Sequence, residues 1–223
     1  MAKTTTLKTT TPKTTMLKTT TPKTTKAKTA KAMTTEPKSS AGDGVVSLKI
    51  TLRNIKPPVW RRLLVQGGMT LGDLHHAIQA AMGWHDCHLH AFEIDGRQYG
   101  DPRTVDDVAN EKRLTVNGLM KSGISSFAYT YDFGDNWEHI IAIEKTQPAI
   151  AGQSYPACVA GARNCPPEDC GGPWGYQELL EVLADPAHPE HAEQIEWIGE
   201  EFDPDAFSVE SADAMLAVHC NRK

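Results

Sequence analysis

The chain has 223 residues and a net charge of −5 at pH 7, but this sum conceals two segments of opposite charge. The first 40 residues contain nine lysines, no arginine and one acid, Glu36, which makes a net charge of +8. The remaining residues contain 14 basic and 27 acidic side chains, which makes −13. No stretch approaches the roughly 18 apolar residues that cross a bilayer, so the sequence excludes a membrane-spanning protein.

Cysteine usage and the N-terminus predict a cytoplasmic protein. The basic N-terminus has no apolar segment behind it, so we do not expect a secretory signal. Five cysteines form an odd set, and without a secretory signal they do not predict a disulfide framework. We therefore expect a reducing, cytoplasmic compartment.

The N-terminal segment contains a repeat, because the string LKTTTPKTT begins at Leu7 and again at Leu17. The repeat has no apolar face that neighbouring copies would bury, so residues 1–42 are predicted to form a disordered, solvated tail. Two functions remain open: a solubilising leader, or a tether that binds nucleic acid weakly and without sequence preference through phosphate contacts. The lysines that would make such contacts are Lys8, Lys13, Lys18, Lys23, Lys26, Lys28 and Lys31.

Residues 43–223 contain all the aromatic residues and are long enough to bury a core. Apolar and polar residues alternate from Val46 to Leu52 and predict a half-buried strand. Residues Val59–Val65 predict its antiparallel neighbour. A helix is predicted from the N-cap Thr70 to Gly83, which suits a left-handed C-cap.

Two hairpins follow this helix in the prediction. Residues 88–94 form a strand that turns at Asp95-Gly96, a pair that favours two-residue hairpin turns. Alternation over 127–133 and 137–143 predicts a second hairpin, and it places Phe133 on the same face as Tyr131.

The last third of the chain is predicted to be mostly helical. Residues 146–173 are rich in Pro and Gly and are expected to form an irregular loop. Helices are predicted over 176–183, after Pro189, and over 211–218. Strands are predicted in the first two thirds of the chain and helices in the last third. This order indicates an α+β domain that spans residues 43–223 and has a mostly antiparallel sheet.

Three cysteines in the irregular loop are candidate metal ligands. Cys158, Cys165 and Cys170 are spaced by seven and five residues, wider than the close cysteine pair of most zinc sites. A fourth ligand would be His88, His90 or His139, and His88 is the candidate that we place in the set. The alternative is that these are ordinary thiols, in which case no cofactor is expected.

Two histidines are candidate general bases. Strand alternation points the side chains of His90 and His139 inward. They are either neutral core histidines, or they meet Asp132 and Asp135 of the second hairpin in a general-base or metal site.

Five strings in chain order carry a resemblance to a known family. They are PPVWRRLLV, TLGDLHHAIQAAMGWHDCHLHAF, YTYDFGDNWEH, NCPPEDCGGPWGY and LADPAHPEHAEQIEWIGEEFDPDAF. Over about residues 45–215 the chain resembles the Ri-plasmid ORF-three-like family, whose members are often labelled insertion-element passenger or TnpR-like proteins. The Lys/Thr tail lies outside the family pattern.

The resemblance implies a compact α+β domain without an established catalytic activity. A serine resolvase needs a nucleophilic serine with an arginine cluster, and here Arg61 and Arg62 form the only adjacent arginine pair. We therefore expect an accessory or binding protein rather than an enzyme, with an unidentified protein or small-molecule partner for the acidic domain. The alternative is a metal-dependent or His/Asp acid–base enzyme.

Overall fold

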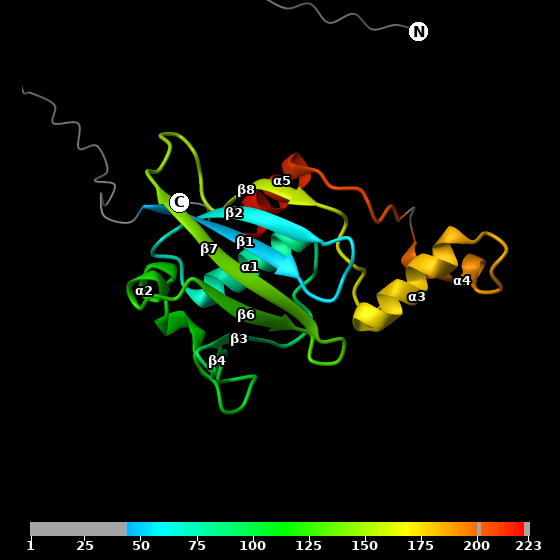
Figure 1. Cartoon of the computed structure of the whole chain (residues 1–223), viewed down its shortest axis with the longest axis horizontal. Helices are drawn as coiled ribbons and strands as arrows, with labels where there is room; N and C mark the ends of the chain where they lie inside the picture. The colour runs from blue at the N-terminus through cyan, green and yellow to red at the C-terminus, as the bar shows by residue number, and fades with distance from the viewer. Residues whose placement is uncertain (1–43, 200–201, 221–223) are drawn as a thin grey trace, which may run out of the picture. The chain divides into compact units, whose positions relative to one another are not determined.

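The computed structural model describes residues 44–199 and 202–220, so the predicted tail and its lysines lie outside the described residues. The described part contains eight strands and five α-helices (Figure 1). The strands are β1 Val45–Leu52, β2 Trp60–Gln66, β3 His90–Ile94, β4 Arg97–Gly100, β5 Ala109–Asn110, β6 Ser126–Tyr131, β7 Trp137–Gln147 and β8 Ala157–Ala162. The helices are α1 Leu71–Met82, α2 Val116–Lys121, α3 Gly172–Ala184, α4 His191–Ile198 and α5 Val209–His219, with a 3-10 helix over Glu111–Arg113.

All eight strands form one sheet in the order β5-β4-β3-β6-β7-β1-β2-β8. Every neighbouring pair is antiparallel except β4 and β5. The predicted α+β class with a mostly antiparallel sheet is therefore confirmed. The described helices include none that is both long and apolar enough to cross a bilayer.

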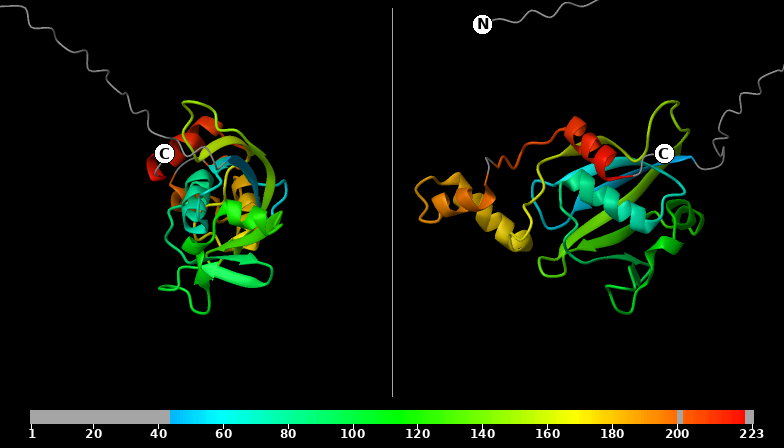
Figure 2. Two further views of the ribbon diagram at one scale, coloured as in Figure 1. Left: turned by 90° about the vertical axis from the view of Figure 1, so that its left-hand side faces the viewer. Right: turned by 180° about the vertical axis from the view of Figure 1, so that it is seen from behind.

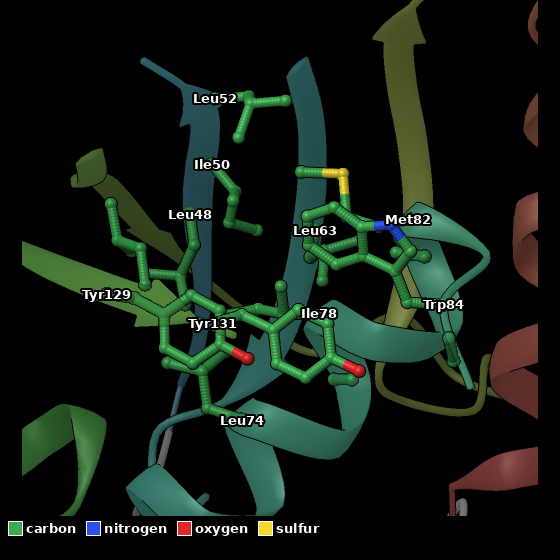
Figure 3. Close-up of a cluster of buried hydrophobic side chains, with 14 of the residues drawn as sticks. Leu48, Ile50, Leu52, Leu63, Leu74, Ile78, Met82, Trp84, Tyr129 and Tyr131 are labelled. Carbon is green, nitrogen blue, oxygen red and sulfur yellow. The ribbon is translucent and has the colours of Figure 1, made fainter. Parts of the chain in front are cut away.

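Helix α1 lies across one face of the sheet, as the view from behind shows (Figure 2). Thr70 begins it through a capping box with Asp73, and Gly83 ends it with a φ of 91°. Its apolar side chains Leu74 and Ile78 are fully buried against the strands. Figure 3 shows them among side chains of β1 and β2, with Tyr129 and Tyr131 of β6 side by side near α1.

Two features of the hairpin and loop regions differ from the prediction. Residues 157–162 of the predicted irregular loop form β8, which pairs with β2 at the edge of the sheet. Strand β6 ends at Tyr131, and Asp132 takes a left-handed φ of 53°. Alternation therefore stops before Phe133, whose side chain is 45% exposed instead of facing the core.

Helices α3 and α4 lie beside each other, and the start of α3 lies near the turn between β6 and β7 (Figure 1). Gly171 N donates a hydrogen bond to Asp135 Oδ2 of that turn, at 3.1 Å. Gly172, with a φ of 69°, lets the chain pass close to the turn, because a Cβ atom at this position would lie 2.3 Å from Asp135 O. The start of α3 and the β6–β7 turn are therefore in direct contact.

Candidate metal centre

The candidate base His139 lies on β7 and is fully buried. Its ring packs edge-on to Trp84 at 5.5 Å, and neither ring nitrogen has a hydrogen-bond partner within the described residues. Burial lowers the pKa of His139 to about 4, so the ring is neutral at neutral pH. A neutral ring enclosed by the core has no access to a substrate, and this position matches the core-histidine alternative.

The other candidate acid–base residues lie in separate places. His90 stacks on His75, with ring centroids 3.4 Å apart. Asp135 accepts the hydrogen bond from Gly171. Asp132 does meet a histidine, but this is His88, whose Nε2 atom lies 3.7 Å from Asp132 Oδ2.

The three candidate cysteines are not brought to His88. Cys158 and Cys165 are buried in the hydrophobic core, and Cys170 is half-buried just before α3. Among the described residues, none of the three belongs to a group with metal-ligand spacing. Burial also raises their pKa values, that of Cys170 to about 12, so these thiols are protonated at neutral pH.

A buried polar network surrounds His75 of α1. Gln79 donates to the Tyr129 hydroxyl at 3.1 Å, so the hydroxyl can direct its own proton to His75 Nδ1 at 2.8 Å. His75 Nε2 in turn lies 2.7 Å from Asp86 Oδ1. The stacked His90 pairs with Glu111 at 2.8 Å. We call this set the His75 network; its members are His75, Gln79, Asp86, His90, Glu111 and Tyr129.

A second group of titratable side chains lies where three loops meet. His88 Nε2 is 3.2 Å from Asp169 Oδ1, 3.6 Å from Glu168 Oε2 and 3.7 Å from Asp132 Oδ2. This nitrogen is itself buried and makes no hydrogen bond in the described structure. We call His88, Asp132, Glu168 and Asp169 the loop cluster.

The two oxygens of the Glu168 carboxylate are hydrogen-bonded unequally. Oε1 accepts hydrogen bonds from the backbone N–H of His85 at 2.8 Å and from the Tyr131 hydroxyl at 3.1 Å. Oε2 is the oxygen nearest to His88, and it accepts only the longer branch of the Tyr131 hydrogen bond, at 3.4 Å. Two donors on one oxygen therefore turn the other toward the imidazole.

The carboxylate of Asp132 is arranged in the same way. Its Oδ1 accepts hydrogen bonds from the backbone N–H groups of Gly134 at 2.9 Å and Asp135 at 3.4 Å. Its Oδ2 faces His88. Carboxylates that ligate metals are commonly hydrogen-bonded to their surroundings in this way, because outer partners orient the ligand atoms.

Tertiary contacts fasten the three loops of the cluster to one another. Trp84, just before the His88 loop, donates from Nε1 to Pro166 O at 3.0 Å. The contact of Gly171 and Gly172 with Asp135 ties the loop before α3 to the β6–β7 turn. Neither Glu168 nor Asp169 stands out in sequence beyond its position beside Cys170, and only these contacts bring them to His88.

Comparison with known proteins identifies the family. Residues 44–211 match the family described as plasmid pRiA4b ORF-3-like protein. The chain belongs to this family. It is 46% identical over 158 residues to the uncharacterized protein y4hQ of Sinorhizobium fredii, a match that covers 70% of this chain and 81% of that protein.

A solved structure shares the fold of this ORF-3-like chain. The protein of unknown function MM3350 from Methanosarcina mazei is 41% identical, with a TM-score of 0.71. The match covers 75% of this chain and 97% of MM3350. All four residues of the loop cluster lie within the part of the chain that matches the ORF-3-like family.

Proposed function

We propose that this ORF-3-like protein is an accessory protein that binds a divalent transition-metal ion, best matched by zinc, at the loop cluster. The observation that carries the proposal is the buried Nε2 of His88, which lacks a hydrogen bond while three carboxylates surround it. A buried polar atom without a partner is costly, and an ion bound to it would remove that cost.

The distances from His88 Nε2 to the carboxylate oxygens are those of neighbouring ligand atoms in a metal site. Bonds of about 2.0–2.2 Å in a tetrahedral array put neighbouring ligand atoms about 3.4 Å apart. The carboxylate oxygens lie 3.2, 3.6 and 3.7 Å from His88 Nε2. Two overlapping sets have metal-ligand spacing: His88 with Asp132 and Asp169, and His88 with Cys87 and Glu168. An imidazole nitrogen with oxygen and sulfur ligands suits zinc or a similar first-row ion.

The His75 network provides a useful contrast. It also combines histidines with acids, and His75, His76 and Asp86 have metal-ligand spacing. Both ring nitrogens of His75, however, already have partners at 2.7 and 2.8 Å. We therefore assign the His75 network to stability and the loop cluster to binding.

An accessory role agrees with the exposure of the site. The Asp169 side chain is 69% exposed, so one side of the cluster faces solvent, whereas that of Asp132 is 10% exposed. An ion held there would be reachable by a ligand group of a partner protein or a small molecule. Such a partner is part of the proposal, and its identity would follow from a metal-dependent binding screen.

The proposal is tested by the metal content of the full-length protein. After incubation with zinc and extensive dialysis, we expect roughly one equivalent per chain by elemental analysis. His88→Ala should abolish retention, because it removes the nitrogen ligand. His219→Ala is the matched control, since His219 is exposed at the end of α5 and belongs to none of the groups with metal-ligand spacing among the described residues. A folded wild-type protein that retains no divalent transition metal would refute the proposal.

A second activity is proposed for the N-terminal segment. The first 40 residues carry +8 and the rest −13, so phosphate contacts would be concentrated in that segment. We propose that its lysines give weak, salt-dependent association with nucleic acid.

A further inference from the structure

We infer that Tyr131 is a positioning residue of the metal site, which holds Glu168 so that one carboxylate oxygen faces the ion. This inference rests on the proposed function and deepens it. Tyr131 touches two of the three loops that build the cluster, and it directly precedes Asp132 of the third.

The contacts of the Tyr131 hydroxyl are specific. Tyr131 is fully buried at the end of β6, and its ring stacks on that of Trp84 at a centroid distance of 5.0 Å. Its oxygen lies 3.1 Å from Glu168 Oε1 and 3.4 Å from Oε2. The backbone N–H of Cys87, next to His88, donates to the same oxygen at 3.1 Å.

The direction of these hydrogen bonds follows from donor chemistry. A backbone N–H only donates, so the bond from Cys87 uses a lone pair of the Tyr131 oxygen. The hydroxyl proton is then directed to the Glu168 carboxylate, which as an anion only accepts. A phenol ordinarily has a pKa of about 10 and so carries this proton at neutral pH.

The effect on Glu168 is a fixed rotation of its carboxylate. Oε1 receives the His85 N–H and the shorter branch of the Tyr131 hydrogen bond, at 3.1 Å, whereas Oε2 receives the longer branch, at 3.4 Å, and lies 3.6 Å from His88 Nε2. Without the hydroxyl, one backbone donor would remain on Oε1, and the carboxylate would turn more freely. Zinc binding would then have to fix the orientation of Glu168 Oε2, and the entropy lost in doing so would lower the zinc affinity.

The test is Tyr131→Phe, with zinc affinity measured on the full-length protein by competition with a chelating dye. We expect binding to weaken 10- to 100-fold, the usual effect of removing an outer-shell partner. Tyr129→Phe is the matched control. Both tyrosines are fully buried on β6, but the Tyr129 hydroxyl belongs to the His75 network. Tyr129→Phe should leave zinc affinity within about twofold.

A double-variant cycle separates positioning from a general structural effect. If Tyr131 acts through Glu168, then adding Tyr131→Phe to Glu168→Ala should weaken zinc binding by less than about twofold. If Tyr131→Phe weakens zinc binding as much in the Glu168→Ala protein as in the wild type, the inference is overturned. Unchanged zinc binding in Tyr131→Phe alone would also overturn it. In both cases the metal site itself would stand. Absence of zinc binding in the wild type would overturn both proposals.

A folding control keeps the test decisive. Far-UV circular dichroism must match the wild type for every variant compared. If Tyr131→Phe does not fold, Glu168→Asp replaces it, because shortening the side chain by one methylene withdraws the carboxylate from the hydroxyl. Wild-type zinc affinity in folded Glu168→Asp would then overturn the inference.

Discussion

The buried imidazole of His139 should make the stability of this protein fall in mild acid. Its pKa is about 4 in the folded protein, against an ordinary value of 6.5. Between these two values the unfolded chain binds a proton that the folded protein excludes, so lowering the pH favours unfolding. Above the ordinary pKa neither state is protonated at this residue, and the effect disappears.

The magnitude follows from the two pKa values. At about 1.4 kcal/mol per pKa unit, the full loss below the folded pKa is about 3 kcal/mol. Between about pH 7.5 and pH 5 the loss from His139 is about 2 kcal/mol. This is a large share of the roughly 5–15 kcal/mol that stabilises a typical domain.

The variant His139→Leu tests this reasoning because leucine has a similar volume and does not titrate. Urea unfolding is followed by tryptophan fluorescence near pH 7.5 and pH 5, with a chelator present so that metal release does not contribute. The wild type should lose about 2 kcal/mol more than His139→Leu over this interval. His85→Gln, which removes an exposed imidazole, should behave like the wild type. An equal loss in the wild type and in His139→Leu would refute the argument.

Two further predictions concern the loops and the N-terminal segment. Gly172→Ala should lower the free energy of unfolding by about 1–3 kcal/mol in chemical denaturation, because its Cβ would clash with Asp135 O and its φ is 69°. It should also weaken zinc binding, because it displaces the loop that carries Glu168 and Asp169. The control Gly199→Ala, also at a left-handed φ but with open space around its Cβ, should leave zinc affinity unchanged. Deleting residues 1–40 should abolish salt-sensitive retention on a DNA column, and retention that survives the deletion would place the nucleic-acid contacts elsewhere.

Local patterns were sufficient for most of the elements. The strand and helix at residues 46–52 and 70–83 were predicted correctly, because the periodicity of apolar residues and the caps act within a few positions. Strand β8 was missed because its small residues, ACVAGA, carry little strand signal. Its formation depends on pairing with β2, a contact across about 100 residues that no local pattern contains.

The candidate site shows the same division. The sequence by itself identified His88 as a candidate metal ligand and Asp132 as a candidate acid–base residue, but it did not place the two together. It grouped His88 with cysteines, since Cys158 and Cys165 lie in one loop with Cys170. Only the tertiary structure shows that Cys158 and Cys165 lie in the core and that Cys170 packs against it. It also shows that Glu168 and Asp169 lie next to His88.

The sequence therefore determined the division of charge, the α+β class and the family, all of which depend on composition or on short motifs in order. The tertiary structure decided which of the two histidine groups has unmet bonding capacity. That property depends on hydrogen bonds between segments far apart in the chain, and on which carboxylate oxygen each donor occupies. The charge of −13 outside the first 40 residues thus follows from composition alone. That three of the acids face one imidazole nitrogen is a consequence of packing.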